Sequence, residues 1–308
     1  ACRSGSDGRM REAVQRWAIK RVLNVTRAFL ASDPTPARIR TATARAAPLV
    51  ARRESYEVSV PFAVGEAHAH WVQPAGVPTD GVILYFHGGG FIAESTRIHD
   101  PLLAALGRAA GARGFMMDYR LAPEHPFPAA VEDCFAAWNF LLSSGIDPGR
   151  IVIAGDSAGG NLAVVTAMRA RDEGLPQPAA LVLLSPVLDL TFSGASVDRN
   201  DGLDPMLRAA TVRTLTSYYG TGMDLRDPRL SPLFGRLTGL PPSMLLVGSS
   251  ELLIDDTLRF AARVAGARAS VWHDMPHVFP AIRGLMAGDR AIREIGDFIR
   301  ERTAPATT

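Results

Sequence analysis

A serine between two glycines, where a strand pattern meets a helix pattern, is the feature that most constrains this fold. The segment Gly155–Gly159 (GDSAG) follows the short apolar run Ile151–Ala154 and precedes the helical pattern Asn161–Arg171. This spacing and context predict a tight strand-to-helix turn that presents the serine hydroxyl at the end of a sheet. Glycines two residues to either side let the chain turn sharply. Ser157 is therefore our candidate nucleophile; the alternative is a serine that caps the helix.

Short apolar runs alternate with helical patterns along most of the chain. Two early segments predict an antiparallel pair of strands, and six later runs predict further strands, of which the short apolar run Val82–Phe86 is expected to be buried. In chain order they are Ser55–Val60, Ala67–Val72, Val82–Phe86, Gly114–Met117, Ile151–Ala154, Ala180–Leu184, Met244–Gly248 and Ala269–Trp272. Apolar strands that alternate with helices are typical of a mostly parallel sheet covered on both faces. We expect an α/β fold with an eight-stranded sheet flanked by helices.

Two regions do not fit this alternation. Residues 10–31 carry apolar residues at helical spacing, and a weaker helical stretch follows at 37–45. About sixty residues separate the strands that end at Leu184 and begin at Met244, far more than the dozen or so that a crossover needs. Within them, Asp204–Tyr219 is expected to be a helix. We expect residues 1–50 to form the N-terminal part of a cap, residues 51–308 a catalytic domain, and an insertion at about 187–225 to complete the cap.

A glycine-rich loop directly follows the third predicted strand. In His87–Phe91 (HGGGF), the glycines allow the backbone to approach a substrate, and such loops supply N–H donors to an oxyanion hole. The candidate donors are Gly88, Gly89 and Gly90, with the last two preferred, joined by the N–H of Ala158. The alternative is a phosphate-binding loop, but the G-x-G-x-x-G spacing and the P-loop lysine are missing.

A serine nucleophile needs a general base, which should follow it in the chain on this kind of sheet. His273 and His277 are the two histidines after Ser157. His277 lies in the loop beyond the last predicted strand, and active sites on such sheets form at the carboxyl ends of strands. His277 is therefore the candidate base, and we interpret His273 as a surface residue at the end of the strand.

The base in turn needs a carboxylate to orient it. Glu251 lies three residues past the strand that ends at Gly248 and is the preferred acid, with Asp255 as the second choice. We expect Asp255 and Asp256 to cap the helix that follows, because an acid at a helix start is a natural cap. We expect the Glu251 carboxylate within about 2.6–3.2 Å of Nδ1 of His277.

Other charged residues near these motifs are interpreted as structural. Asp156, beside the candidate nucleophile, is expected to point away from it and toward the loop that carries the acid. Arg120 and Glu124 are expected to pair and hold a proline-rich loop. His87 precedes the serine, so a hydrogen bond that shapes its own loop is expected rather than a role as base.

The motifs together resemble the hormone-sensitive lipase-like carboxylesterases of bacteria, often called family IV, within the α/β-hydrolase superfamily. The matching segments occur in the expected order: His87–Phe91, Asp118–Ala129, Gly155–Asn161 and His277–Phe279. The resemblance implies an eight-stranded sheet with a cap, hydrolysis of short- to medium-chain acyl esters, and no cofactor. The family usually has Asp where this chain has Glu251, although some relatives use Glu.

The same serine, acid and histidine set could instead open a lactone. A non-catalytic small-molecule receptor on this fold is a further alternative, because fold alone does not determine function. The plant gibberellin receptors resemble the family but lack the catalytic histidine, whereas His277 is present here.

The composition limits the kinds of partner and the location that we expect for this protein. With 33 Lys and Arg, 31 Asp and Glu and no block of like charge, no nucleic-acid partner is expected. Two cysteines make no disulfide framework, and no spacing of His and Cys is typical of a metal site. The apolar runs are too short for stable membrane insertion, and no signal peptide is visible, so cytoplasmic location is expected. The last strand is expected at a sheet edge, where it could pair with a second copy in a homodimer.

Overall fold

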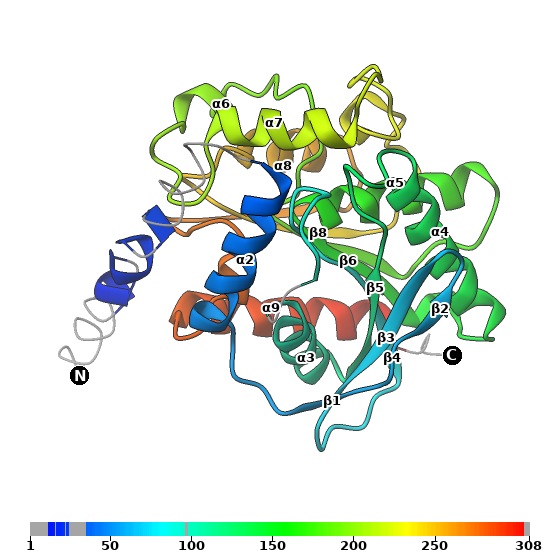
Figure 1. The fold of residues 1–308 in the computed structure, drawn as a ribbon. Helices are drawn as coiled ribbons and strands as arrows, with labels where there is room; N and C mark the ends of the chain where they lie inside the picture. Colours follow the sequence, from blue (N-terminus) through cyan, green and yellow to red (C-terminus); the bar gives the residue numbers. More distant parts are fainter. Residues whose placement is uncertain (1–11, 16, 22, 25–34, 96–97, 305–308) are drawn as a thin grey trace, which may run out of the picture.

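The sheet runs through the middle of the molecule with helices on both faces (Figure 1). The structure is a computed structural model that describes residues 12–15, 17–21, 23–24, 35–95 and 98–304. The strands are β1 (Tyr56–Val58), β2 (Phe62–Val64), β3 (Ala67–Pro74), β4 (Gly81–Phe86), β5 (Ala112–Asp118), β6 (Ile151–Asp156), β7 (Ala180–Leu184), β8 (Ser243–Gly248) and β9 (Arg268–Trp272). Their order is β1-β3-β5-β4-β6-β7-β8-β9, with β2 paired to β3.

The sheet is mostly parallel, as expected. From β5 to β9 all neighbouring strands are parallel, whereas β3 pairs antiparallel with β1, β2 and β5. The described residues form nine strands where the sequence predicted eight. The additional strand, β2, has three residues, too few to show an alternating pattern. It forms a hairpin with β3 through a two-residue turn at Gly65, whose φ is 61°.

The central strands β4, β6, β7 and β8 are buried on both faces, which explains why they are mostly continuous apolar runs, whereas the edge strands β1 and β9 are largely exposed. Along β4, Leu84 and Phe86 belong to one hydrophobic core and Ile83 and Tyr85 to the other, because side chains alternate across a strand. The first core contains residues of α4 (Ala129–Ser143), α5 (Ala158–Asp172) and α8 (Ile254–Ala261). The second contains residues of α3 (His99–Ala110) and α9 (Met286–Thr303).

The remaining helices belong to the regions expected to form a cap. They are α2 (Pro36–Val50), α6 (Ser196–Arg199) and α7 (Ala209–Tyr219). Outside these regions, short 3-10 turns lie at Pro148–Arg150, Pro232–Phe234 and Phe279–Ala281. Of the helix predicted at 10–31, residues 12–15, 17–21 and 23–24 are helical, and the rest lies outside the described residues.

The helix α7 begins five residues later than the predicted start at Asp204. The Asp204 side chain accepts hydrogen bonds from the N–H groups of Met206 and Leu207, at 2.8 and 3.0 Å, and this holds a turn before the helix. Within the described ranges, no helix is long and apolar enough to cross a membrane.

Candidate active site

Ser157 lies at the tight junction between β6 and α5. Its φ of 52° and ψ of −117° are strained for a residue with a side chain. The flanking glycines make the turn possible, since a Cβ on Gly155 would lie 2.4 Å from Gly159 and a Cβ on Gly159 would lie 1.9 Å from the oxygen of Phe86. The Ser157 side chain makes no capping hydrogen bond to α5, so the helix-cap alternative does not describe it.

Glu251 and His277 form the hydrogen bond expected from the sequence. Oε2 of Glu251 lies 2.7 Å from Nδ1 of His277, and both side chains are buried. Oε1 of Glu251 accepts hydrogen bonds from the Ser185 hydroxyl at 2.9 Å and from the N–H of Gly248 at 2.5 Å. The carboxylate is therefore held at both oxygens, and it orients the imidazole ring so that Nε2 is left for other contacts.

Ser185 also contacts Glu251, and it was not among the site residues expected from the sequence. Its hydroxyl donates to Glu251 and accepts the N–H of Val278, the residue after His277, at 3.1 Å. Ser185 directly follows β7 at the carboxyl end of the sheet, and that position was the one signal that pointed to it. The Ser185 side chain therefore contacts both the loop that carries Glu251 and the loop that carries His277.

The environment of His277 favours its protonated form. Burial lowers the pKa of His277, but the hydrogen bond to Glu251 and the charge of that carboxylate outweigh burial, and the pKa is raised above its usual range. The more distant carboxylates of Asp204 and Asp156 act in the same direction. The imidazole is therefore a stronger base than an isolated histidine.

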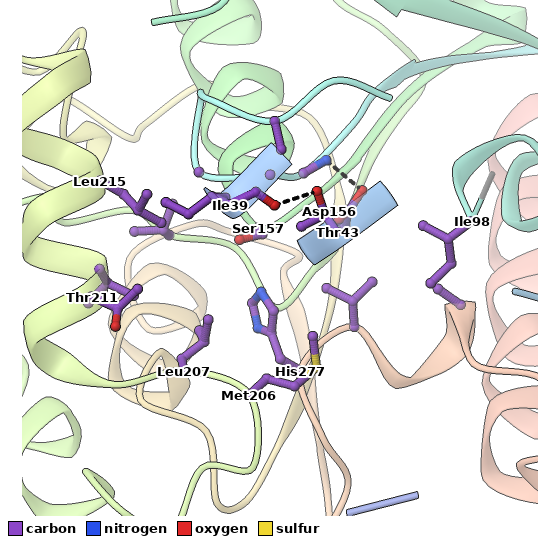
Figure 2. Close-up of a pocket in the computed structure, with 18 of the residues that line it drawn as sticks. Ile39, Thr43, Ile98, Asp156, Ser157, Met206, Leu207, Thr211, Leu215 and His277 are labelled. Atoms are coloured by element: carbon purple, nitrogen blue, oxygen red, sulfur yellow. Dashed lines mark hydrogen bonds between the residues drawn. The ribbon is translucent and has the colours of Figure 1, made fainter. Parts of the chain in front are cut away.

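Ser157 and His277 face one cavity of about 260 Å³ (Figure 2). Its walls are mostly apolar and come from both regions expected to form the cap. Figure 2 shows Ile39 of α2 on one wall and Leu215 of α7 on another. His273, in contrast, is exposed and does not line this cavity.

The glycine loop also lines the cavity, but its three glycines are not equivalent. The N–H of Gly88 donates to Oδ1 of Asp156 at 2.9 Å, so Gly88 is not a free donor and its assignment to the oxyanion hole is wrong. Gly89 and Gly90 have φ of 122° and 64°, which favour glycine. In the part of the chain that the structure describes, the N–H groups of Gly89, Gly90 and Ala158 donate to no protein acceptor.

The Asp156 side chain points toward the glycine loop. The sequence had led us to expect it to point toward the loop that carries Glu251. Oδ1 of Asp156 also accepts the hydroxyl of Tyr85 at 2.8 Å, and Nε2 of His99 lies 3.7 Å away. Burial raises the pKa of Asp156, but the nearby His99 and the hydrogen bonds outweigh it and lower the pKa. Asp156 therefore stays ionised and holds the glycine loop against the end of β6.

His87 shapes its own loop, as predicted. Its Nδ1 lies 2.7 Å from the oxygen of Gly88, and its ring stacks on Tyr119 with centroids 4.3 Å apart. Burial lowers the pKa of His87 to about 4, so the ring is neutral at physiological pH.

Arg120 and Glu124 are structural residues, but they do not pair with each other. Arg120 binds Asp133 at 2.8 Å and also contacts Glu66. Glu124 binds Arg40 of α2 at 2.6 Å. The residues between them separate the two ion pairs, and the pair of Arg40 with Glu124 connects α2 to the loop after β5.

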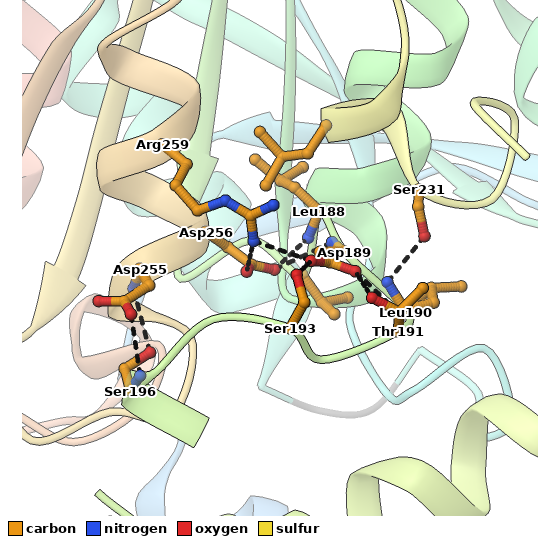
Figure 3. Close-up of polar contacts among 12 residues, drawn as sticks. Leu188, Asp189, Leu190, Thr191, Ser193, Ser196, Ser231, Asp255, Asp256 and Arg259 are labelled. Carbon is orange, nitrogen blue, oxygen red and sulfur yellow. Dashed lines mark hydrogen bonds and ion pairs between the residues drawn. The ribbon is translucent and has the colours of Figure 1, made fainter. Parts of the chain in front are cut away.

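Asp255 and Asp256 do not cap α8, so that expectation is wrong. The N-cap position is Leu253, which has no capping side chain. Asp255 accepts the N–H of Ser196 at 2.8 Å, and Oδ2 of Asp256 accepts the N–H groups of Leu188 and Asp189 at 2.7 and 3.0 Å (Figure 3). Both carboxylates therefore hold the segment after β7, and neither approaches His277 as Glu251 does.

Burial raises the pKa of Asp256 to about 7, with a further contribution from the charge of Asp189. Arg259 lies between these two carboxylates, 2.8 Å from Oδ2 of Asp189 (Figure 3). Among the described residues, no group of three or more His, Cys, Asp or Glu side chains could hold a metal ion.

Comparison with known proteins identifies the family of this chain. A family model described as alpha/beta hydrolase fold matches residues 83–281. An "Acetyl-hydrolase" of Streptomyces hygroscopicus is 44% identical over 246 residues, covering 78% of this chain and 82% of the relative. "Esterase LipU" of Mycobacterium tuberculosis is 33% identical, covering 81% of this chain and 89% of that protein.

Among solved structures, an esterase from the bacterial hormone-sensitive lipase family superimposes with a TM-score of 0.86 at 37% identity, covering 92% of this chain and 97% of that one. The structure of EstE5 soaked with p-nitrophenyl butyrate has a TM-score of 0.87 at 34% identity, covering 94% of this chain and 99% of that one. With the family model matching more than half of its length, the chain belongs to the alpha/beta hydrolase fold family and is a carboxylester hydrolase of the hormone-sensitive lipase type.

Proposed function

We propose that Ser157, His277 and Glu251 are the catalytic residues of this carboxylester hydrolase. The observation that carries the proposal is the 2.7 Å hydrogen bond between Glu251 and His277 beside the cavity that Ser157 faces. Glu251 keeps the proton of the imidazole on Nδ1, which leaves Nε2 as an acceptor for the proton of the serine hydroxyl.

The reaction then proceeds in two halves. Oγ of Ser157 attacks the ester carbonyl carbon while Nε2 of His277 takes the hydroxyl proton. His277 gives that proton to the leaving alcohol, and the acyl group stays on Ser157. Water then attacks the acyl-enzyme, His277 takes its proton and returns it to Oγ, and the carboxylic acid leaves. General-base catalysis of this kind contributes about 10²–10⁴-fold.

The negative charge on the carbonyl oxygen needs donors, and we assign these to Gly89, Gly90 and Ala158. Their N–H groups have no protein acceptor in the described structure, whereas that of Gly88 binds Asp156. Ala158 begins α5, so the partial positive charge of the helix N-terminus adds to this stabilisation. Each donor of this kind contributes about 3–4 kcal/mol to transition-state stabilisation.

The cavity supports uncharged esters of short to medium acyl chain as substrates. Its volume of about 260 Å³ and its apolar walls suit a small hydrocarbon chain better than a charged group. The curated relative named acetyl-hydrolase supports the short end of this range.

The cap is proposed to consist of residues 1–50 and the insertion at about 187–225, placed on a catalytic domain of residues 51–308. The cavity supports this division, since α2 supplies Thr43 and α7 supplies Thr211 to its walls. Lys20 pairs with Asp274, three residues before His277, and so links the N-terminal part to the histidine loop. Cytoplasmic location and a homodimer formed through β9, the last strand of the sheet, stay predictions.

A direct test compares Ser157→Ala with Ser144→Ala, a matched change on the exposed end of α4. Hydrolysis of p-nitrophenyl acetate, butyrate, octanoate and palmitate is measured beside that of a γ-lactone. We expect Ser157→Ala to lose activity on every ester at unchanged Tm, and Ser144→Ala to behave as the wild type. Activity of Ser157→Ala near that of wild type contradicts the assignment. A wild-type enzyme that prefers the lactone, or palmitate, contradicts the proposed substrate class.

A further inference from the structure

The backbone around Glu251 is held by the cap insertion and not by the sheet alone. We define the acid loop as residues 249–253. Nδ2 of Asn200 donates to the carbonyl oxygen of Glu251 at 2.8 Å, and the hydroxyl of Ser196 donates to the carbonyl oxygen of Leu252 at 2.6 Å. The N–H of Leu252 donates to Oδ2 of Asp204 at 3.1 Å. The peptide groups on the carboxyl side of Glu251 therefore have their partners in the segment 196–204.

These contacts are buried, so water does not replace them readily. Ser196 and Asp204 are 0% exposed and Asn200 is 5% exposed. The neighbouring hydrogen bond between Ser196 and Asp255, shown in Figure 3, connects the insertion to the start of α8 as well. Removing one partner of a buried hydrogen bond leaves the other group without water or protein to bind, which is unfavourable. The acid loop consequently depends on the insertion for its conformation.

Asp204 connects the acid loop to the wall of the substrate cavity. Its Oδ1 accepts the N–H groups of Met206 and Leu207, both of which line the cavity, while its Oδ2 accepts the N–H of Leu252. One carboxylate thus fixes a wall of the substrate pocket and the residue next to the acid. Burial, together with the charge of Glu251, raises the pKa of Asp204, while the N–H donors favour its ionised form.

We propose that Asp204 and Asn200 are positioning residues that hold Glu251 against His277 through the backbone of the acid loop. The inference rests on the proposed catalytic role of Ser157, His277 and Glu251. A carboxylate suits the position of Asp204, because both of its oxygens accept hydrogen bonds. Asparagine has only one acceptor oxygen. Its NH₂ group would face either the N–H of Leu252 or the N–H groups of Met206 and Leu207, so donor would oppose donor.

Displacement of the acid loop should lower the rate of the chemical step more than substrate binding. A shift of about 1 Å in a catalytic group costs about 10²-fold in rate. We therefore expect Asp204→Asn to lower kcat about 100-fold with KM changed less than about twofold, and Asn200→Ala to lower kcat about 10-fold. The low-field proton resonance of His277 Nδ1–H, which reports its hydrogen bond to Glu251, should shift in both variants.

The matched control is Asp201→Asn. Asp201 lies in the same insertion, where its carboxylate binds Arg208 at 2.7 Å and accepts the N–H of Ala209 at 3.1 Å. This variant should keep kcat, KM and the low-field resonance of the wild type. If Asp204→Asn fails to fold, Asn200→Ala carries the test by the same three measurements.

Two outcomes overturn the inference. One is a folded Asp204→Asn or Asn200→Ala with wild-type kcat and an unshifted resonance. The other is an effect confined to KM or chain-length preference, which would make Asp204 part of the pocket wall alone. Ser157→Ala measured in parallel separates the two proposals. Full activity in Ser157→Ala refutes the proposed function itself, whereas an inactive Ser157→Ala beside an unaffected Asp204→Asn refutes only the positioning role.

Discussion

Replacing Glu251 by glutamine keeps the size of the side chain and removes its charge, and the structure indicates how the amide would sit. Oε1 accepts the N–H of Gly248 at 2.5 Å and the hydroxyl of Ser185 at 2.9 Å. An NH₂ group at that position would oppose the N–H of Gly248, so the amide oxygen should stay there. The NH₂ group of the glutamine then faces Nδ1 of His277, where the carboxylate now accepts a hydrogen bond.

That orientation places the proton of the imidazole on the wrong nitrogen. Nδ1 of His277 must accept from the amide, so Nε2 carries the proton and cannot take that of Ser157. The analogous change in a serine protease costs about 10⁴-fold in kcat. We expect a similar loss here, equivalent to about 5 kcal/mol, since each tenfold in rate corresponds to about 1.4 kcal/mol.

The pH dependence should change in the same experiment. The base form of His277 is required, and Glu251 raises its pKa, so wild-type kcat/KM should fall as the pH drops through this raised pKa. Glu251→Gln removes the raising charge and should move the acid limb to lower pH. The assay is hydrolysis of p-nitrophenyl butyrate between pH 5 and pH 9 by purified, folded proteins.

Asp255→Asn is the matched control, because Asp255 lies in the same region but binds Ser196. Asparagine keeps one oxygen that can accept this N–H, so we expect kcat within about threefold of wild type and a stability loss of at most about 1 kcal/mol. The reverse ranking, with kcat preserved in Glu251→Gln and lost in Asp255→Asn, would refute the reasoning and transfer the acid role to Asp255.

Two further perturbations test the loop and the buried carboxylate. Gly89→Ala should lower kcat by about 10²-fold or more by displacing the oxyanion donors, because its Cβ would lie 2.7 Å from the oxygen of Ala93. Gly145→Ala, also at a positive φ but in open space, should leave kcat unchanged, and equal kcat values for the two variants would contradict the loop's role. The pKa of Asp256 is about 7 in the folded protein, above its unfolded value, so the contribution of Asp256 to wild-type stability should fall as the pH rises from about 4 to about 7. Asp256→Asn lacks this loss, so its stability relative to wild type should rise over that window, by on the order of 4 kcal/mol at most, and level off above it. Urea unfolding measures this difference. A constant difference between pH 4.5 and pH 8 would contradict a buried carboxyl group with a raised pKa.

The architecture was predictable from the sequence because its signals are local. A parallel strand with both faces covered needs apolar residues at every position, and β4 illustrates this with Leu84 in one core and Ile83 in the other. The turn at Ser157 was equally local, since the glycines that permit it lie within two residues. The short strand β2 was missed because three residues carry no detectable period.

The position of His277 was also predictable, from chain order and from the rule that sites form at the carboxyl ends of strands. The preference for Glu251 rested on its distance past β8, and the hydrogen bond to His277 agrees with it. Sequence distance alone left Asp255 open, because both carboxylates belong to one short connection between a strand and a helix.

The tertiary structure alone decided which partner each polar group takes. The N–H of Gly88 is bound by Asp156, 68 residues later, so one of three consecutive glycines is not free to donate to a substrate. The insertion likewise binds the acid loop through Asp204, 48 residues before Leu252. No local pattern encodes such pairs, because they form only where loops from different strands meet at one edge of the sheet, and there each buried donor must find an acceptor.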